Sequence, residues 1–346
     1  MARKILFASL ALVPVVLAAE YLFHAGDVTL FVLAAIALIP LAWLIGEATE
    51  HAAHHTGPGV GGFLNATFGN APELIIALFA VAALEFEVVR GSLTGSVVGN
   101  LLLVLGFSLL FGGRGAIDRE SSFTSLAIVA VSVVLFLIPA IPSWDGDPER
   151  RSLAVLSIPV SIALLVVYLV VTWLALRRHR ELHLTEEPSD MLAWSLRLGL
   201  AVLAVATVAT ALVAEALVGS LETFAHEAGL TEFFVAAVIV AIVGNAAEHG
   251  GAVVVAYRGK IKLAAEIALA SSAQVAVFLI PAVALLSWLI EPLALSFREV
   301  EIAVLAVATL VTAALLADGR SSRLKGALLI VAYIGAATAF YLAGDR

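Results

Sequence analysis

Apolar runs long enough to cross a lipid bilayer follow one another along almost the whole chain. A transmembrane helix needs about 20 consecutive, mostly apolar residues. Runs near this length predict eleven helices, over residues 5–23, 28–50, 59–84, 91–112, 121–141, 153–176, 191–218, 231–256, 262–289, 299–317 and 324–343. Runs of this length span lipid as helices, which satisfy their own backbone polar groups. The sequence therefore predicts an all-α polytopic membrane protein.

The composition agrees with this fold class and excludes several others. Hydrophobic residues make up 62% of the 346 residues and charged residues 13%, whereas a soluble domain is about half apolar and about a quarter charged. Cysteine is absent, which excludes disulfides, thiol catalysis and cysteine-bound metals. The formal net charge of −8 argues against nucleic acid as a partner. Membrane lipid is the expected surrounding, and a homo-oligomer is compatible with the sequence.

Basic residues are distributed unequally between the two sides of the predicted bundle. The first apolar run follows Arg3 and Lys4 as in a signal peptide, but it lacks a clear cleavage site, so we interpret it as a transmembrane helix. With a cytoplasmic N-terminus, fourteen of the 19 Lys and Arg residues face the cytoplasm. The five on the other side are Arg90, Arg150, Arg151, Arg298 and Arg346. This bias follows the positive-inside rule and predicts an external C-terminus.

A five-residue motif occurs twice, each time within an apolar run. Gly69–Glu73 reads Gly-Asn-Ala-Pro-Glu, and Gly244–Glu248, 175 residues later, reads Gly-Asn-Ala-Ala-Glu. The same offset aligns further identical pairs without gaps, namely Glu47 with Glu222, His51 with His226, and Ser96 with Ser271. The repeat divides the chain into an extra helix within 1–25, a first repeat at 26–176, a cytoplasmic linker at 177–190 and a second repeat at 191–346.

The two repeats are predicted to have opposite orientations in the membrane. Each comprises five helices, and an odd number of crossings leaves the second repeat upside down relative to the first. Inverted repeats with a binding site near the midplane are characteristic of secondary transporters. The pattern therefore favours a transporter over an enzyme.

Glu73 and Glu248 are the strongest candidates for binding a transported cation. An intramembrane carboxylate is costly unless it is compensated, so two at equivalent positions indicate a paired site. Pro72 and Gly69 predict a break in helix 59–84, which frees backbone carbonyls from Asn65 to Gly69 as further ligands. The helix that starts near Glu73 directs its positive end at the carboxylate. Helix 231–256 repeats the pattern without a proline, so we expect a weaker bend there.

Neutral oxygen and amide groups on neighbouring helices complete the candidate site. They are Asn70, Asn245, Ser96, Asn100, Ser271, Ser272 and Gln274. Ca²⁺ takes about six to eight oxygen ligands at roughly 2.3–2.6 Å, a number that this set and two carboxylates can supply with backbone carbonyls and water. Small and hydroxyl residues also join transmembrane helices. Both roles stay open for the serines and for Asn100, whereas Gln274 is better placed for the site.

Acidic and histidine side chains at the helix ends form a second set of candidates. Four share one face at the end of helix 28–50, namely Glu47, Glu50, His51 and His54. Their counterparts at the other end are Glu222, His226 and Glu227. We hypothesise a proton or cation pathway here, with a solvated helix end and a zinc site as alternatives. His249, next to Glu248, either tunes proton coupling or faces water.

The two motif regions resemble the calcium/proton exchanger (CAX) family of the calcium/cation antiporter superfamily. The resemblance rests on Gly61–Ile75 and Val243–His249, with support from Leu101–Gly106 and Ser271–Gln274, and it extends from the second helix to the end of the chain. Two positions depart from the family pattern. Gly99 stands where members often have serine, and Ala270 stands where they usually have a small residue, commonly glycine.

The resemblance implies a fold and a function. It implies eleven helices, the first outside two inverted five-helix repeats, and exchange of Ca²⁺ for H⁺ at Glu73 and Glu248. The asparagines, serines and Gln274 named above then line or support the site. Ca²⁺ is the transported substrate, and no cofactor is implied. The long N-terminal extension of plant vacuolar members is absent, which favours a prokaryotic plasma membrane.

Three other functions remain open from the residues. A Na⁺-coupled exchanger belongs to the same superfamily, although the Gly-Asn-x-x-Glu copies resemble the proton-coupled branch. A cation channel with a glutamate selectivity filter is a second alternative, which inverted repeats disfavour. A zinc metalloenzyme built on Glu50, His51 and His54 is the third, and it requires a bound metal.

Overall fold

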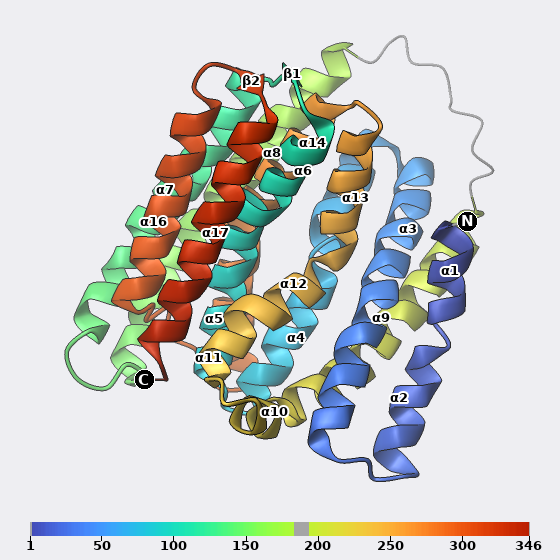
Figure 1. Cartoon of the computed structure of the whole chain (residues 1–346), viewed down its shortest axis with the longest axis vertical. Coiled ribbons are helices and arrows are strands. Elements are labelled where there is room, and N and C mark those ends of the chain that lie inside the picture. The colour runs from blue at the N-terminus through green and yellow to red at the C-terminus, as the bar shows by residue number, and fades with distance from the viewer. Residues whose placement is uncertain (1, 183–193, 346) are drawn as a thin grey trace.

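The computed structural model describes residues 2–182 and 194–345, which form an upright bundle of helices (Figure 1). The first half contains α1 (Ala2–Ser9), α2 (Leu12–Tyr21), α3 (Asp27–Phe68), α4 (Ala71–Ala82), α5 (Phe86–Val98), η1 (Gly99–Val104), α6 (Leu105–Gly112), β1 (Gly115–Ala116), α7 (Arg119–Ala140), η2 (Ile141–Ser143) and α8 (Arg151–Leu182). The second half contains α9 (Leu196–Gly219), α10 (Leu221–Ala228), α11 (Glu232–Phe234), η3 (Val235–Val240), α12 (Ala241–Gly244), α13 (Ala246–Tyr257), α14 (Ile261–Gln274), η4 (Val275–Leu279), α15 (Ile280–Leu286), η5 (Ser287–Leu289), α16 (Glu299–Leu316), β2 (Arg320–Ser321) and α17 (Arg323–Ala343).

The predicted all-α membrane class is confirmed. Within the described residues, eight helices are long and apolar enough to cross a membrane, and a ninth is counted if the pair Leu221–Ala228 and Glu232–Gly244, bent by 108°, is one span. The other predicted runs are divided among shorter helices, such as α1 with α2. Most of the linker predicted at 177–190 lies outside the described residues, because α8 ends at Leu182.

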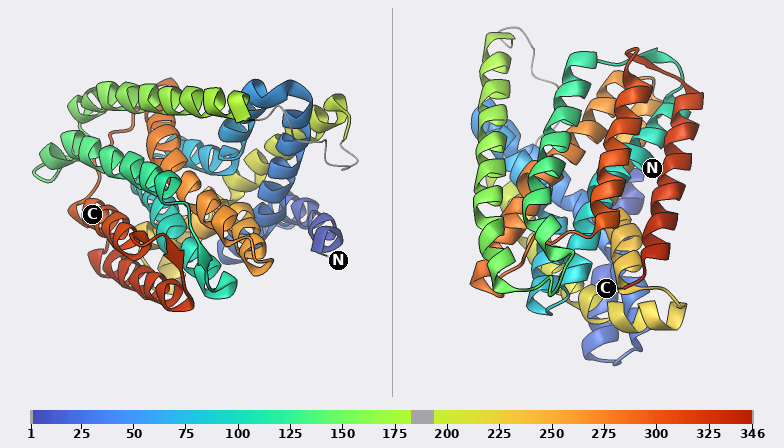
Figure 2. Two further views of the ribbon diagram at one scale, coloured as in Figure 1. Left: turned by 90° about the horizontal axis from the view of Figure 1, so that it is seen from above. Right: turned by 90° about the vertical axis from the view of Figure 1, so that its left-hand side faces the viewer.

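The outer faces of the bundle are apolar, as a lipid surrounding requires. Large side chains such as Val134, Leu310 and Val331 are more than half exposed on α7, α16 and α17. Helices α16 and α17 stand side by side in both views of Figure 2. Exposed apolar patches of this extent are unfavourable in water.

The break predicted at the first motif is present, and a second break occurs without a proline. Helix α3 ends at Phe68, Gly69 and Asn70 form a turn, and α4 begins at Ala71. Pro72 lies in the first turn of α4, where its missing N–H leaves no helical hydrogen bond unmade. In the second copy, α12 ends at Gly244 and α13 begins at Ala246, so that Asn245 alone forms the turn.

Element boundaries recur at the offset of 175 residues. Helix α4 (71–82) corresponds to α13 (246–257), and α5 (86–98) corresponds to α14 (261–274). Each of α5 and α14 leads into a π-helical segment, η1 or η4. Such segments widen the helix by one residue per turn and often lie at functional sites. The duplication is therefore visible in local structure as well as in sequence.

The two ends of the bundle are distinct. The upper end in Figure 1 carries β1 and β2, and we call it the sheet end. The lower end carries α10 and the C-terminus, and we call it the α10 end. Helices α4 and α13 run from their breaks toward opposite ends. Leu84, after α4, lines a cavity with Asp345 at the α10 end, whereas Ile261, after α13, lies against Gly115 of β1.

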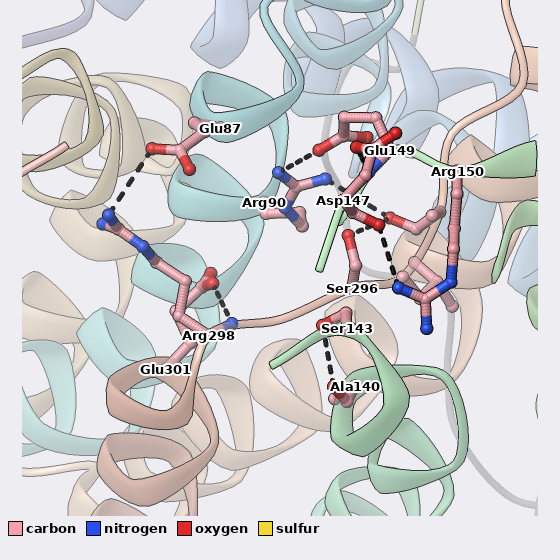
Figure 3. Close-up of polar contacts among 12 residues, drawn as sticks. Glu87, Arg90, Ala140, Ser143, Asp147, Glu149, Arg150, Ser296, Arg298 and Glu301 are labelled. Carbon is pink, nitrogen blue, oxygen red and sulfur yellow. Dashed lines mark hydrogen bonds and ion pairs between the residues drawn. The ribbon is translucent and has the colours of Figure 1, made fainter. Parts of the chain in front are cut away.

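A buried ionic network holds the start of α5 at the α10 end (Figure 3). The Arg90 guanidinium, 1% exposed, donates to Glu149 at 2.7 Å and to the Ala294 carbonyl at 3.5 Å. The fully buried Glu301 carboxylate accepts from the Thr94 hydroxyl at 2.9 Å and from the Arg298 backbone N–H at 2.8 Å. These contacts tie α5 to α16 and to the segment before it.

Close packing further fixes α5, which carries Ser96 to the centre of the bundle. A Cβ on Gly95 would lie 2.0 Å from the Ala237 carbonyl oxygen, so only glycine fits at this crossing of α5 and η3. The matching residue of the second repeat is Ala270, which is exposed and has room for its methyl group. This difference in packing explains why the second repeat accommodates alanine at a position where glycine is common in the family that the motifs resemble.

Candidate cation site

The two motif glutamates lie at equivalent places in the fold. Glu73 is in the first turn of α4, and Glu248 is in the first turn of α13. Glu73 is buried, with 7% of its surface exposed, and it is close enough to Glu248 for their charges to interact. Each helix presents unpaired N–H groups and the positive end of its dipole near its carboxylate. The two breaks therefore bring two carboxylates and two helix N-termini to one region.

Gly244 allows Glu73 to approach the second motif. A Cβ on Gly244 would lie 3.1 Å from the Glu73 Cγ atom, so the Glu73 side chain rests against the backbone just before Asn245. A cavity of about 10 Å³ lies beside Glu73, and Ser92 and Ser96 supply polar atoms to its wall. This volume corresponds to about one water molecule. The surroundings of Glu73 are therefore closely packed in this conformation.

A continuous hydrogen-bond chain connects five of the predicted site residues. The Asn100 Nδ2 atom donates to Asn245 Oδ1 at 3.3 Å and to Ser271 Oγ at 2.9 Å. Ser271 Oγ in turn donates to Glu248 Oε2. The Asn245 Nδ2 atom donates to Ser96 Oγ at 2.8 Å. Residues 145 or more positions apart in the sequence thus share one network around Glu248.

The remaining predicted members divide between the site and helix packing. The Asn70 Nδ2 atom donates to Gln274 Oε1 at 3.5 Å, which joins the first break to the end of α14. Ser272 Oγ instead donates to two backbone carbonyls, Val97 at 3.4 Å and Ala268 at 3.1 Å. Ser272 therefore contacts helix backbone, whereas its neighbour Ser271 contacts Glu248.

Buried oxygen atoms of the site that have no hydrogen-bond partner within residues 2–182 and 194–345 include Glu73 Oε2 and Asn100 Oδ1. Leaving a buried acceptor unpaired costs about 1–3 kcal/mol, and more for a charged group. A hard cation such as Ca²⁺ takes carboxylate and amide oxygens as ligands. These atoms are therefore chemically suited to hold a cation between the two motifs.

The candidates near the sheet end form local contacts. His51 Nε2 lies 3.6 Å from a Glu47 carboxylate oxygen, and the His51 ring stacks on Trp194 with 4.5 Å between ring centroids. Glu50 and His54 are exposed. In the described part of the chain, no three His, Cys, Asp or Glu side chains are gathered closely enough to hold a metal. The zinc alternative therefore gains no support.

The candidates near the α10 end line a cavity. Glu222 and His226 face a space of about 480 Å³ that Glu232 and Asp345 also line. Glu227, beside them in sequence, is exposed. His249 is partly buried, and its buried Nε2 atom has no hydrogen-bond partner among the residues that the structure describes. A cavity lined by acidic and histidine side chains therefore lies at this end of the bundle.

The sequence alone did not predict the π-helical segments, the contact of Gly95 with Ala237 or the contact of Gly244 with Glu73. Asn100 lies within η1, and Gln274 immediately precedes η4, so both amides project from irregular turns. Neither segment has a sequence signature, because π turns arise from packing. Gly99 has open space around its Cβ position, so the serine of the family pattern would fit there.

The chain is similar to known proteins over most of its length. The family described as sodium/calcium exchanger protein matches residues 26–177 and 198–342. A Ca²⁺/H⁺ antiporter of Synechocystis sp. is 37% identical over 98% of this chain and 97% of its own, and the Ca²⁺/H⁺ antiporter ChaA of Bacillus subtilis is 37% identical over 93% and 94%. The solved structure of native YfkE has a TM-score of 0.84 at 33% identity, and it covers 97% of this chain and 99% of its own.

The adjacent serines of α14 test which groups belong to the site. We expect Ser271→Ala to weaken Ca²⁺ binding by about tenfold or more, because it removes the hydrogen bond that orients Glu248. Ser272→Ala removes only a contact with backbone and should change binding less than threefold. Equilibrium binding of ⁴⁵Ca²⁺ to the purified variants measures both effects. Equal losses in the two variants would contradict this assignment.

Proposed function

Because the chain belongs to the sodium/calcium exchanger protein family, we propose that it is a secondary antiporter that exchanges Ca²⁺ for H⁺ across a membrane. The observation that carries the proposal is the pairing of Glu73 and Glu248 at two helix breaks inside an apolar bundle. Relatives that this chain matches over nearly their whole length are named Ca²⁺/H⁺ antiporters. These names describe transporters and not enzymes, and the residues of the site are suited to binding and releasing ions.

Competition for one pair of carboxylates explains the exchange. Two negative charges near each other in a low-dielectric interior repel, and either protons or a divalent cation relieves the repulsion. Ca²⁺ requires both carboxylates in the ionised form, so bound Ca²⁺ and bound protons exclude each other. Asn70, Asn245, Asn100, Ser96, Ser271 and Gln274 support or complete this site, whereas Ser272 mainly joins helices.

The charge of the site also explains why ions do not leak. Two ionised carboxylates are neutralised by one Ca²⁺ or by two protons, so both loaded states carry no net charge. An empty site would carry two buried charges through the closed state, at a large desolvation penalty. Each ligand shifts the equilibrium between inward and outward forms by its differential affinity for them. With an inward proton gradient, the net direction is Ca²⁺ export.

We propose that the fold is an inverted duplication with eleven membrane helices. The boundaries that recur at an offset of 175 residues support a duplication, and the opposite directions of α4 and α13 support inversion. A further contact favours a pseudo-twofold relation, because Ser272 donates to Val97, its counterpart at that offset. Helices α1 and α2 would then stand outside the two repeats, as the extra N-terminal element.

We further propose that the sheet end faces the cytoplasm of a prokaryotic cell. Arg114, Arg258, Lys260, Arg320 and Lys325 gather at that end, in agreement with the positive-inside rule. Relatives of similar length come from bacteria. Glu47, Glu50 and His51 then lie on the cytoplasmic approach, and Glu222 and His226 on the external one. His249 lies between them, next to the site.

Ion flux tests the proposed function. In proteoliposomes with an acidic interior, we expect ⁴⁵Ca²⁺ uptake that Glu73→Gln and Glu248→Gln each abolish, because a neutral amide neither binds protons nor balances Ca²⁺. Glu266→Gln, on α14 and partly exposed, is the matched control and should retain uptake. Uptake that follows a Na⁺ gradient at fixed pH would favour a Na⁺-coupled exchanger. Flux without any counter-ion would favour a channel.

Cysteine labelling tests the inverted arrangement, since the chain contains no cysteine. Glu85 and Lys260 occupy equivalent positions, as the residues that precede α5 and α14. We expect a membrane-impermeant maleimide to label Glu85→Cys in intact cells and Lys260→Cys only in inverted vesicles. Labelling of both cysteines from the same side would exclude an inverted duplication.

A further inference from the structure

A basic groove lies beside the two-stranded sheet, at the opposite end of the bundle from the network of Figure 3. Its volume is about 530 Å³. The charged side chains that line it are Arg114, Arg320, Lys325 and Asp318, and Ser321 and Ser322 add hydroxyl groups. None of these residues belongs to the candidate cation site. The groove is therefore separate from the cation site, and its basic side chains suit an anionic ligand.

The charges of the groove are only partly compensated. The Lys325 Nζ atom donates to Asp318, which lowers the pKa of Asp318 and keeps that carboxylate ionised. Arg320 also lowers the pKa of Asp318, so this one carboxylate is shared by Lys325 and Arg320. The side chains of Arg114 and Arg320 are exposed and have no hydrogen-bond or ion-pair partner within residues 2–182 and 194–345. With one carboxylate for three cationic side chains, the groove keeps a net positive charge, and the guanidinium groups of Arg114 and Arg320 both face it.

Backbone contacts hold the two arginines in place without a ligand. Strand β1 pairs with β2 so that Ala116 lies opposite Arg320 and Gly115 opposite Ser321. Ser321 Oγ donates to the Gly113 carbonyl at 2.7 Å, and the Ile117 N–H donates to the Gly319 carbonyl at 2.9 Å. Two loops that are distant in sequence are thereby joined on either side of the groove. The backbone that carries the two arginines is therefore fixed before a ligand binds, which limits the entropy lost on binding to that of their side chains.

The groove opens where phospholipid headgroups would lie. Helices α6 and α16 end just before its first residues, at Gly112 and Leu316, and α17, which carries Lys325, begins at Arg323. The exposed apolar side chains Phe111 and Leu324 flank it, at 51% and 70% exposure. A headgroup in the groove would therefore place its acyl chains along apolar helix faces.

We propose that this groove binds the headgroup of an anionic phospholipid and that the headgroup phosphate lies between Arg114 and Arg320. Guanidinium groups bind phosphate through paired N–H donors. Ser322 starts α17, a helix of 21 residues whose N-terminal dipole adds positive potential on the same side. The Ser322 hydroxyl, which accepts from the Lys325 backbone N–H at 3.3 Å, provides one further donor. Free inorganic phosphate shares this chemistry, and binding measurements separate the two sources.

Native mass spectrometry of the full chain tests the proposal. The probes are dioctanoyl phosphatidylglycerol, dioctanoyl phosphatidylcholine and inorganic phosphate. The double variant Arg114→Gln/Arg320→Gln should bind phosphatidylglycerol about 25-fold more weakly, at about fivefold for each charge near an anionic lipid. Phosphatidylcholine should bind weakly to both proteins, and phosphate should bind more weakly than phosphatidylglycerol.

The matched control is Arg258→Gln/Lys260→Gln, which removes two exposed charges from the turn between α13 and α14 at the same end. It should change phosphatidylglycerol binding less than threefold. Equal losses in the two double variants would show diffuse surface attraction and overturn the proposal, as would unchanged binding in the Arg114/Arg320 variant. Phosphate binding as tight as that of the lipid would overturn the headgroup assignment. Because both arginines are exposed, retained proton-driven Ca²⁺ uptake serves as the check on folding.

Discussion

The placement of two carboxylates, one buried and one partly buried, inside an apolar bundle is the constraint on which the rest of this structure depends. Carboxylates in such surroundings require donors, cations or protons. Two helix breaks supply N-terminal dipoles, and Asn100, Asn245 and Ser271 supply hydrogen bonds around Glu248. Gly244 removes the side chain that would keep Glu73 away from the second motif. These features support the proposal that the two carboxylates act as one site.

The site is only approximately symmetric. Ser96 and Ser271 are equivalent by sequence offset, yet Ser271 donates to Glu248 whereas Ser96 accepts from Asn245. The two amide side chains occupy positions that do not correspond in the two repeats, because Gln274 matches Gly99 and Asn100 matches Val275. The amide donors of the network thus differ between the repeats. Glu248 accepts from Ser271, whereas Ser96, the equivalent serine of the first repeat, pairs with Asn245. The two halves of a transport cycle are therefore not required to be energetically alike.

Much of the fold could be predicted from the sequence, because the lipid environment restricts the chain to long apolar helices. The break at Pro72 followed from the missing N–H of proline, and the pairing of Glu73 with Glu248 followed from the repeated motif. The break at Asn245 has no comparable sequence cause, and the π-helical turns at Asn100 and Gln274 depend on contacts between helices. For the same reason, the separate roles of Ser271 and Ser272 become visible only when their partners are located.

The most direct test of a shared site is the number of protons released when Ca²⁺ binds. Isothermal titration calorimetry of the purified protein in buffers of different ionisation enthalpy measures this number. If protons and Ca²⁺ compete for Glu73 and Glu248, binding releases protons, release increases as the pH is lowered, and Glu73→Gln reduces it. Tight Ca²⁺ binding with no proton release across the range from pH 5 to 8, roughly the span over which protein carboxylates and histidines exchange protons, would contradict the account.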